Sequence, residues 1–409
     1  MELITWLYLL YAFISFYFFF VFFLLYVSNR EEIFSYPKKT KEYEISIIIP
    51  CYNKEKEISD NIKSVLNSDY KNIKKIIIVD DCSTDDSARI IKEYSKKYKK
   101  VIYVKTPNNT GCAAGAKNYG AQFAETEIIG FVDADSFLQK DTIDKMVGFF
   151  SNQNIATVTP QILVRNRKRF LTKLQAVEYK IIALTRKLFG FIDAIYVAPG
   201  PLALYRNKIF KEIGGFDENN ITEDIEITWN IVAHGYKVEM SFPSKVYTEA
   251  PEKFKEWFNQ RIRWTIGGMQ TVKKYKGHMA KMGILGNFIL PFFIFSWIIA
   301  LFGIAVIGYR LIRGLILRYL STTYSIKAET AILTLKEINL TPNILIFFGA
   351  ILILFSAYLV WIAMINTKEE EFKKQNLFTI LFYMFIYVML YPITLITSTY
   401  KFLRKKESW

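Results

Sequence analysis

The chain has little histidine and little cysteine, and this limits the chemistry that it can support. Among 409 residues there are two histidines, His234 and His278, and three cysteines. Two histidines are too few for a histidine-rich zinc site and make a serine-histidine-aspartate triad hard to build. An odd number of cysteines without paired spacing argues against a disulfide framework and indicates a reducing compartment. Any chemistry must therefore rest on carboxylates.

The sequence also lacks the glycine-rich loops that cradle phosphates. No stretch matches a Walker loop, and none matches Gly-x-Gly-x-x-Gly after the first predicted strand. The formal charge is +15, but the basic residues are spread along amphipathic segments and beside apolar runs, without a basic-aromatic array. We therefore expect no nucleic-acid partner, and expect contact with anionic membrane lipids on the cytoplasmic side.

Long hydrophobic runs, by contrast, are plentiful. Four of them can each cross about 30 Å of hydrocarbon as a helix, at residues 4–27, 284–307, 344–365 and 377–396. The first has no basic start or cleavage site, so it is expected to be an anchor rather than a signal peptide. Basic residues after it place the next domain in the cytoplasm, but the basic tail at 401–406 leaves the number of later spans open. The chain is predicted to be a multi-pass protein of the cell membrane.

Strands and helices alternate between the first two apolar runs. Apolar β-branched runs predict strands at residues 45–50, 76–79, 101–104 and 128–132, with helices at 55–66, at 87–98 and after Gly111. Ser83 or Thr84 is expected to cap the second helix. This order predicts an α/β fold with a mostly parallel sheet and helices on both faces. Polar residues follow four strand ends, which lie along one edge of such a sheet.

Two carboxylates, Asp133 and Asp135, follow the last of these strands. Side chains two apart on an extended chain face the same way, so these two are expected to share a face. Hard oxygen ligands suit Mg²⁺ or Mn²⁺ carrying a diphosphate, and Ala134 allows the phosphates to approach. The alternative is an acidic turn that merely ends a strand. Lys117, on the predicted helix after Gly111, is the nearest cation to this edge of the sheet and is expected to help hold the diphosphate. The alternative is a lysine that is simply exposed to solvent on that helix.

Several short motifs occur in order along residues 44–268. They are Pro50-Cys51-Tyr52-Asn53-Lys54-Glu55, Val79-Asp80-Asp81-Cys82-Ser83-Thr84-Asp85, Asp133-Ala134-Asp135, Gly214-Gly215-Phe216-Asp217-Glu218 with Thr222-Glu223-Asp224, and Gln260-Arg261-Ile262-Arg263-Trp264. Together they resemble the inverting family 2 glycosyltransferases of GT-A fold. The last motif is similar to the Gln-x-x-Arg-Trp signature of membrane-embedded polymer synthases. One departure is Cys82, which stands where a glycine is common.

This resemblance implies a role for each matching residue. Pro50, Tyr52, Asn53, Asp81, Lys117, Asp133 and Arg263 would bind the nucleotide sugar, and Asp133 and Asp135 would hold Mg²⁺ or Mn²⁺. Asp224 would be the general base, with Glu223 beside it raising its pKa by like-charge proximity. Gly200, Thr222, Gln260 and Trp264 would lie on the acceptor side.

The resemblance also indicates a substrate class. Residues 198–206 are similar to hyaluronan and chitin-oligomer synthases, and residues 260–268 to poly-N-acetylglucosamine synthases. Both favour an N-acetylhexosamine or glucose donor. We expect metal-dependent transfer from a UDP-sugar to a growing polysaccharide, processive and coupled to export, with an accessory membrane subunit as a further partner. The alternative is transfer of one sugar to a polyprenyl phosphate or glycolipid.

The expected organisation has four parts. Residues 1–29 form a membrane helix, 30–264 the cytoplasmic catalytic domain, 265–283 an interfacial helix, and 284–409 a membrane region of about three helices. The amphipathic segment 167–188 is expected either to lie on the membrane or to pack on the soluble core. A transporter with a nucleotide-sensing domain is disfavoured, because the apolar runs contain almost no charged residues.

Overall fold

The computed structural model describes residues 3–328, 344–367, 369 and 376–404. The chain divides into two compact units. One comprises Met1–Val21 with Phe292–Leu359, and the other comprises Phe22–Pro291 with Val360–Trp409. The first unit is built from apolar helices, and the second contains the β-sheet and the candidate site.

The first unit contains the start of α1 (Leu3–Asn29), most of α10 (Leu290–Lys327) and most of α11 (Ile344–Asn366). Aromatic rings join these helices. Phe19 stacks on Phe355 with 3.8 Å between ring centroids, and Phe18 lies 3.8 Å from Phe292. Large apolar side chains on α10, such as Ile298 and Phe302, remain exposed. Such a surface suits lipid rather than water.

Three helical stretches in the described part of the chain are long and apolar enough to cross a membrane. They are Ala12–Asn29, Leu285–Lys327 and Leu377–Leu403, and Ala350–Asn366 is a shorter apolar helix. Three of the four predicted runs therefore appear as membrane-length helices, and the fourth falls short in the described residues. Within the basic tail, Lys405 and Lys406 lie outside the described residues.

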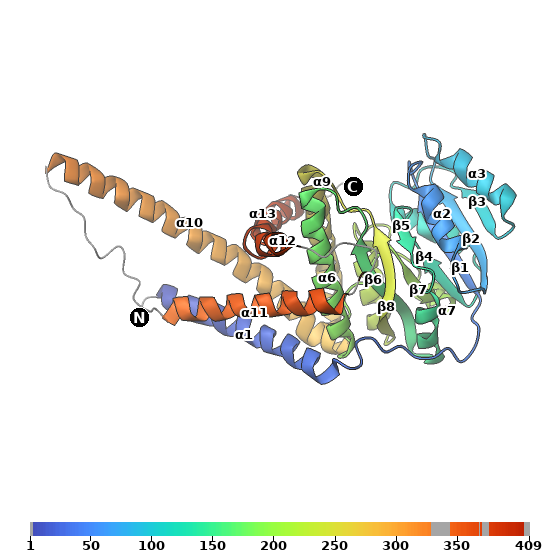
Figure 1. Cartoon of the computed structure of the whole chain (residues 1–409), viewed down its shortest axis with the longest axis horizontal. Coiled ribbons are helices and arrows are strands. Elements are labelled where there is room, and N and C mark those ends of the chain that lie inside the picture. Colours follow the sequence, from blue (N-terminus) through green and yellow to red (C-terminus); the bar gives the residue numbers. More distant parts are fainter. Residues whose placement is uncertain (1–2, 329–343, 368, 370–375, 405–409) are drawn as a thin grey trace. The chain divides into compact units, whose positions relative to one another are not determined.

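The second unit is organised around one eight-stranded sheet with the order β3-β2-β1-β4-β7-β6-β8-β5 (Figure 1). The strands are β1 (Ile45–Cys51), β2 (Ile73–Asp80), β3 (Val101–Lys105), β4 (Ile128–Phe131), β5 (Ser136–Leu138), β6 (Ile155–Val164), β7 (Ala203–Arg206) and β8 (Lys237–Thr248). The pairs β1–β2, β1–β4, β2–β3 and β6–β8 are parallel, and the other three are antiparallel. The mostly parallel α/β fold is confirmed, with an antiparallel insertion at β7.

The remaining elements complete this unit. The α-helices are α2 (Ile58–Leu66), α3 (Ser87–Lys97), α4 (Ala113–Ala121), α5 (Asp144–Val147), α6 (Phe170–Gly190), α7 (Asn207–Glu212), α8 (Glu223–Ala233), α9 (Phe254–Tyr275), α12 (Leu377–Phe382) and α13 (Leu390–Leu403). Short 3-10 segments lie at Gly148–Ser151 and Lys276–Lys281, and π-helical turns at Leu285–Ile289 and Tyr383–Tyr387. The predicted boundary between residues 264 and 265 lies inside α9, which is continuous.

Helices cover both faces of the parallel strands. Ile47 and Ile49 of β1 belong to the same buried cluster as Ile58 of α2. The alternate residue, Ile48, lies against Gly120 of α4. Because successive side chains on a strand point to opposite faces, α2 and α4 must lie on opposite sides of the sheet. The prediction of helices on both faces is correct.

The start of α3 differs from the prediction. The helix begins at Ser87, whose backbone N–H donates to Oδ1 of Asp85 at 3.0 Å. Ser83 and Thr84 do not cap it. The Oγ of Ser83 accepts from the N–H of Asn53 at 3.1 Å, and the N–H of Thr84 donates to Oδ1 of Asn53 at 2.8 Å. Both residues are used to join the loops after β1 and β2.

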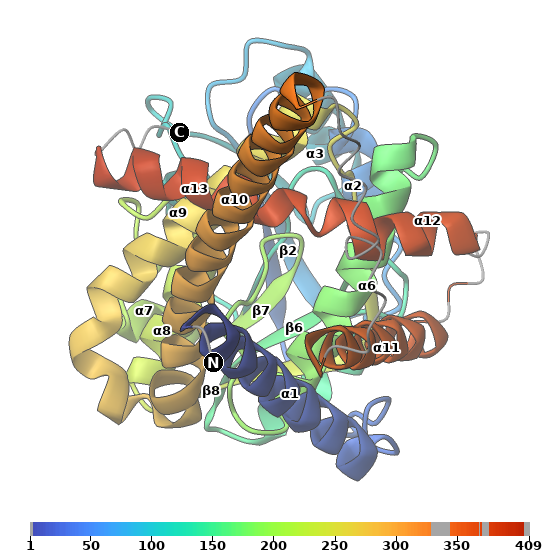
Figure 2. The same ribbon diagram turned by 90° about the vertical axis from the view of Figure 1, so that its left-hand side faces the viewer.

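The amphipathic segment 167–188 largely forms α6. This helix packs on β6 and β8, so the structure favours the second of its two predicted roles, packing on the core. Figure 2 shows α12 and α13 crossing this side of the unit, where α12 packs on α6 and α13 packs on α9. The side chains of α12 and α13 that are buried include Thr379, Thr394 and Ser398. These polar side chains therefore lie on the packed side of the two helices, and apolar residues such as Phe378 and Met389 are exposed.

Candidate functional site

The loop after β2 holds Asp81 in a cage of hydrogen-bond donors. Its Oδ1 accepts from Oγ1 of Thr106 at 2.7 Å and from the N–H of Thr110 at 2.9 Å, and its Oδ2 accepts from Oγ1 of Thr110 at 2.8 Å. The residue is 5% exposed. Asp81, which the motif resemblance assigns to the nucleotide-sugar site, is therefore held in a fixed orientation by side chains of its neighbouring loop.

The loop after β1 is fastened to this loop by Asn53. Asn53 adopts a positive φ of 51°, and its side chain accepts from Thr84. Pro50 is inside β1, paired with Val79, rather than at the end of the strand as predicted, because the strand continues to Cys51. Tyr52 is 50% exposed. Its ring is therefore accessible next to the loops that hold Asn53 and Asp81.

Asp133 and Asp135 lie in a turn just past β4 and not on extended chain as the prediction assumed. The N–H of Ser136 donates to the backbone oxygen of Asp133 at 3.0 Å, which closes the turn. Oδ1 of Asp133 lies 3.1 Å from Nζ of Lys117, and Oδ2 of Asp135 lies 2.7 Å from Nζ of Lys54. Both carboxylates remain about one-third exposed, at 34% and 29%. Each therefore has a lysine partner and an open side.

Gly200 gives the carboxylate of Asp133 its space. A Cβ at this position would stand 2.5 Å from Oδ2 and 3.0 Å from Oδ1 of Asp133. The backbone oxygen of Gly200 also accepts from the N–H of Asp133 at 3.3 Å. Any side chain here would meet the carboxylate directly, which explains why this residue lacks one.

Lys117 is not a solvated helix lysine. It lies inside the protein, where its Nζ contacts Oε1 of Glu223 at 2.8 Å as well as Asp133, and its side chain is 2% exposed. Burial alone would lower the pKa of Lys117, but the carboxylates of Asp133 and Glu223 raise it above its ordinary value. Lys117 therefore stays charged and joins the strand-end carboxylates to the start of α8.

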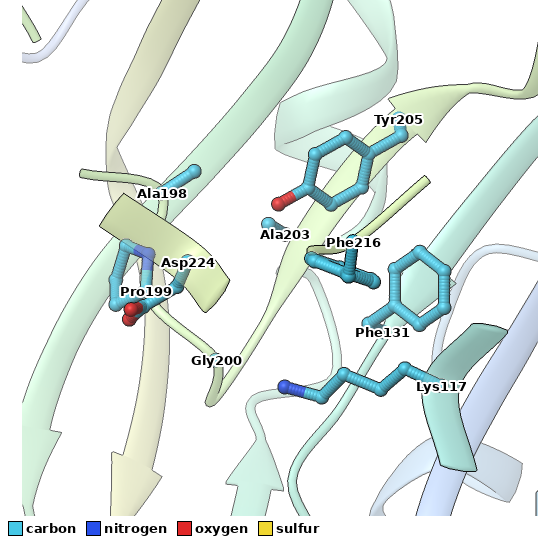
Figure 3. Close-up of a pocket in the computed structure, with 9 residues that line it drawn as sticks. All are labelled: Lys117, Phe131, Ala198, Pro199, Gly200, Ala203, Tyr205, Phe216 and Asp224. Atoms are coloured by element: carbon cyan, nitrogen blue, oxygen red, sulfur yellow. The ribbon is translucent and has the colours of Figure 1, made fainter. Parts of the chain in front are cut away.

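A small, shallow pocket that is partly open to solvent lies beside this ion pair. Lys117 from α4 and Asp224 from α8 both reach into it (Figure 3). The other lining residues are Phe131, Ala198, Pro199, Gly200, Ala203, Tyr205 and Phe216. The pocket thus combines a cation, a carboxylate and an apolar wall.

Asp224 has the properties of a base that works near neutral pH. Burial and, next, the charge of Glu223 raise its pKa to about 6. Its Oδ1 accepts only from the N–H of Ile225, at 2.9 Å, among the described hydrogen bonds. It retains some contact with solvent. A weakly bonded carboxylate at a pocket wall is able to accept a proton from a bound hydroxyl.

Two of the predicted residues are placed behind the pocket rather than in it. Thr222 precedes α8, is 5% exposed and packs against Gly267 of α9. The carboxylate of Glu223 accepts a hydrogen bond from Nζ of Lys117. Both therefore support Asp224 from behind, and neither lines the pocket.

The motif on α9 contains a buried arginine that the sequence analysis missed. Arg261 is 1% exposed and donates to Oε2 of Glu178 and to Oε1 of Gln260, each at 2.6 Å. Its guanidinium lies 4.1 Å from the ring centroid of Trp264. Arg263 is exposed, and no ion pair joins it to another described residue. Arg261 thus orients Gln260 and Trp264, while Arg263 is available to a ligand.

Three residues carry parts of this site that sequence reasoning did not find: Lys54, Arg261 and Tyr205. Each lies inside or beside a motif, so its position gave a signal. No signal in the sequence indicated the residue that each side chain contacts. Lys54 and its partner Asp135 are 81 residues apart, and Arg261 and its partner Glu178 are 83 residues apart. Pattern along the chain does not report such pairings.

The residues present fit a divalent cation that is shared with a ligand. In the described part of the chain there is no group of three or more histidine, cysteine or acidic residues that could hold an ion by itself. Mg²⁺ and Mn²⁺ are commonly held by one or two carboxylates together with substrate phosphates and water. Asp133 and Asp135 have open sides, and both contact lysine ammonium groups, which shows that cationic partners are accommodated there.

The fold agrees with the resemblance seen in the motifs. The mixed α/β sheet carries acidic loops at the ends of its parallel strands, as expected for the GT-A fold. Residues 46–214 match the family model described as Glycosyl transferase family 2. This part of the chain, less than half of its length, is therefore similar to the family 2 glycosyltransferases.

Two known proteins are similar to this chain over part of its length. The chain is 30% identical over 250 residues to a poly-beta-1,6-N-acetyl-D-glucosamine synthase of Staphylococcus epidermidis, covering 61% of this chain and 60% of that protein. It is 28% identical over 230 residues to the synthase of the same name from Staphylococcus aureus strain COL, covering 56% and 55%. The match therefore spans less than two-thirds of these relatives.

A solved structure has the same fold over nearly the whole chain. It is a mannosyltransferase from Pyrobaculum calidifontis in complex with GDP-Man and Mn²⁺, with a TM-score of 0.56 and 17% identity. The match covers 97% of this chain and 99% of that one. At this identity the likeness establishes the fold.

Proposed function

We propose that this protein is an inverting, metal-dependent glycosyltransferase of the cell membrane that transfers an N-acetylhexosamine or glucose from a UDP-sugar to a growing polysaccharide. The observation that carries the proposal is the pocket in which Asp224, with its raised pKa, faces Lys117 and Gly200. The name of the Staphylococcus relatives supports N-acetylglucosamine as the first donor to test.

The nucleotide would lie along the carboxyl ends of β1, β2 and β4. The carboxylate of Asp81 accepts hydrogen bonds, so it suits a base that presents a ring N–H, as uracil does. Tyr52 is exposed beside it and offers a ring face. Arg263 is free to approach the diphosphate as a bidentate donor.

Asp133 and Asp135 would hold Mg²⁺ or Mn²⁺ next to the diphosphate. A bound divalent cation would neutralise the charge that develops on the leaving nucleoside diphosphate. Gly200 keeps the space around Asp133 open, and Lys117 holds that carboxylate in place from the protein side. The chain's own contribution is therefore to fix two oxygen ligands at one edge of the sheet.

The transfer step requires one base and no protein nucleophile. The acceptor hydroxyl gives its proton to a carboxylate oxygen of Asp224. At the same time the hydroxyl oxygen forms the new bond to the anomeric carbon. The bond between that carbon and the diphosphate oxygen breaks on the opposite side, so the configuration inverts. Asp224 is suited to this role because its pKa of about 6 lies near the operating pH.

The acceptor would approach from α9. Arg261 fixes Gln260 by a hydrogen bond and stacks on Trp264, so an amide and an aromatic ring are presented together. Aromatic rings and amides are suitable partners for sugar rings and their hydroxyls. The ordering of these two side chains before binding reduces the entropy lost when the acceptor binds.

The membrane-length helices support a multi-pass location. The basic residues after the first apolar run support a cytoplasmic side for the unit that contains the sheet. We propose the same four parts as in the sequence prediction, with α9 forming one helix across the predicted boundary at residue 264. Processive synthesis, export through the membrane helices and an accessory subunit remain parts of the proposal.

The test is the size of the product. Purified full-length protein in lipid nanodiscs is incubated with Mn²⁺ and UDP-N-acetylglucosamine, UDP-glucose or UDP-N-acetylgalactosamine in turn, and UDP release and product length are measured. We expect one donor to yield a ladder or high-mass glycan, and chelation of the metal to stop it. Absence of turnover with every UDP-sugar would refute the donor class.

A matched variant separates chemistry from binding. Asp224→Asn keeps the shape of the side chain and removes its basicity, so we expect turnover to fall by at least about 1,000-fold with UDP affinity unchanged. Loss of UDP binding in this variant would contradict the assignment of Asp224 as the base.

The alternative acceptor is a lipid. The described residues contain three membrane-length helices, a small number from which to build a polymer channel. One sugar added only when a polyprenyl phosphate or glycolipid is supplied would identify this alternative.

A further inference from the structure

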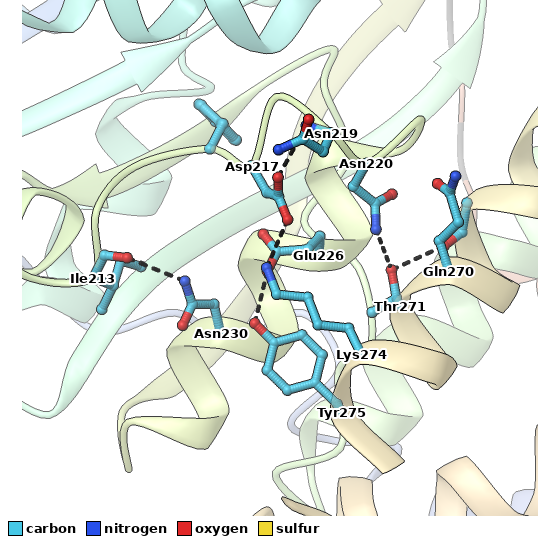
Figure 4. Close-up of polar contacts among 12 residues, drawn as sticks. Ile213, Asp217, Asn219, Asn220, Glu226, Asn230, Gln270, Thr271, Lys274 and Tyr275 are labelled. Carbon is cyan, nitrogen blue, oxygen red and sulfur yellow. Dashed lines mark hydrogen bonds and ion pairs between the residues drawn. The ribbon is translucent and has the colours of Figure 1, made fainter. Parts of the chain in front are cut away.

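A buried carboxylate on α8 is held by two side chains of α9. Glu226, two residues after Asp224, is 0% exposed. Its Oε1 accepts from Nζ of Lys274 at 2.6 Å and from the hydroxyl of Tyr275 at 2.7 Å (Figure 4). Lys274 also donates to Oδ2 of Asp217 at 2.6 Å. We name these four residues, Asp217, Glu226, Lys274 and Tyr275, the α8–α9 latch.

The segment that leads into α8 is bound to the same helix. Nδ2 of Asn220 donates to Oγ1 of Thr271 at 3.0 Å (Figure 4). The N–H of Ile221 donates to Oε1 of Gln270 at 3.0 Å. Hydrogen bonds from both backbone and side chains therefore fix this segment on α9 immediately before the helix that carries Asp224.

Gly267 allows α9 to lie directly on the start of α8. A Cβ at this position would stand 2.0 Å from Oγ1 and 2.6 Å from Cγ2 of Thr222. No side chain fits in that space, so the two backbones approach closely at the residue that precedes Glu223 and Asp224. Contacts with α9 therefore fix the chain on both sides of Asp224. Thr222, before it, packs against Gly267, and Glu226, after it, binds Lys274.

The contacting residues of α9 share one face. Gly267, Thr271 and Lys274 are spaced by four and three residues, which places them in line along a helix. The same helix carries Gln260 and Trp264 nearer its start. One rigid element therefore connects the acceptor-side residues with the helix of the base.

The chemistry of the latch makes it sensitive to the loss of one partner. Glu226 is fully buried, and its Oε2 has no hydrogen-bond partner among the described residues. Its charge is therefore compensated only through Oε1, by Lys274 and Tyr275. Removal of the ammonium group would leave a buried carboxylate uncompensated, which strongly favours a shift of α8 or entry of water.

From this geometry we propose that the α8–α9 latch is a positioning device for the base: Lys274 and Glu226 hold α8 so that Asp224 stands at the correct distance from the acceptor hydroxyl presented by α9. The inference rests on the proposed function, because it assigns Asp224 the role of base. Lys274 and Glu226 do not touch the pocket, and they act through α8. Displacements of about 1 Å reduce rates by up to about 100-fold, so a small movement of α8 is sufficient.

The experiment compares three variants of the full-length protein in nanodiscs. Lys274→Met removes the ammonium group, Lys274→Arg keeps a cation, and Lys273→Met is the matched control, since Lys273 is the neighbouring exposed lysine and lies over the ring of Phe402. We measure kcat and donor KM per UDP-binding site, together with Tm. We expect Lys274→Met to lower kcat about tenfold or more with donor KM unchanged, and expect Lys274→Arg to recover most of this loss and Lys273→Met to match wild type.

A second variant tests the other half of the contact. Glu226→Gln removes the buried charge while keeping shape, and in combination with Lys274→Met it should lower kcat no further than the more severe single change, because both act on one contact. Unchanged kcat in Lys274→Met, or a loss of total activity that is fully explained by a loss of UDP-binding sites, would overturn the positioning role. These outcomes differ from failure of the proposed function, in which Asp224→Asn retains wild-type turnover or wild type itself does not release UDP.

Discussion

Nζ of Lys54 lies 2.7 Å from Oδ2 of Asp135, although the two residues are 81 positions apart in the chain. Lys54 follows β1 and Asp135 follows β4, so the parallel pairing of these strands brings them to the same edge of the sheet. One oxygen of Asp135 is therefore already engaged by an ammonium group. If Asp135 holds a divalent cation, as we propose, Lys54 would compete with that cation for this oxygen.

This competition predicts that Lys54→Met strengthens metal binding. The pair is about one-third exposed, so it is worth at most about 1 kcal/mol, and its loss should raise Mn²⁺ affinity by up to about fivefold in the absence of nucleotide. Titration of purified protein followed by the paramagnetic resonance of free Mn²⁺ measures this. Lys56→Met, at an exposed lysine of the same loop, is the control. Weaker Mn²⁺ binding in Lys54→Met would show that Lys54 supports the site instead.

The pKa of Asp224 predicts the acidic limb of the pH profile. Burial, and next the charge of Glu223, raise this pKa to about 6, and a base must be deprotonated to act. We therefore expect kcat to rise with pH and to be half-maximal near pH 6. Glu223→Gln removes the second cause, so the limb should move to lower pH. A limb near pH 4 in wild type would contradict this assignment.

Gly200→Ala should damage the metal site without unfolding the protein. The added Cβ would stand 2.5 Å from Oδ2 of Asp133, so the carboxylate or the loop must move. We expect affinity for UDP in the presence of Mn²⁺ to fall about tenfold, with Tm within about 2 °C of wild type. Gly277→Ala is the control, since its Cβ would meet nothing within 4 Å. Equal UDP affinity in both variants would exclude this role for Gly200.

Cys82→Gly should stabilise the fold. Cys82 has a φ of 62°, a left-handed conformation that costs an ordinary residue about 1 kcal/mol and glycine nothing. Part of that gain is offset by the entropy of glycine in the unfolded chain. We expect Tm in detergent to rise by about 2 °C with UDP binding unchanged. A fall in Tm would mean that the contacts of Cys82 with Thr106 outweigh the strain.

The same conformation explains why a glycine suits the position of Cys82. A glycine is common at this position, and the observed φ is one that glycine adopts freely. The turn keeps its shape with cysteine in place. The sequence identified the unusual residue correctly, but only the backbone showed that the turn tolerates it.

Much of the fold was predictable because it depends on local patterns. Apolar β-branched runs predicted β1, β2, β3 and β4, and the alternation with helices predicted parallel pairing. Prediction failed where side chains bond to residues of another segment of the chain. Ser83 and Thr84 were expected to cap α3, but they bond to Asn53 on another loop. The antiparallel insertion of β7 between β4 and β6 has no comparable local signal.

By itself the sequence indicated the fold class and the residue types of the candidate site, because motif residues and strand ends are properties of adjacent positions. It determined Asp133, Asp135 and Asp224 as candidates in this way. Only the tertiary structure decided which charges meet: Lys54 with Asp135, Lys117 with Glu223, and Lys274 with Glu226. These pairs join residues 81, 106 and 48 positions apart, and distance along the chain does not report distance in the fold.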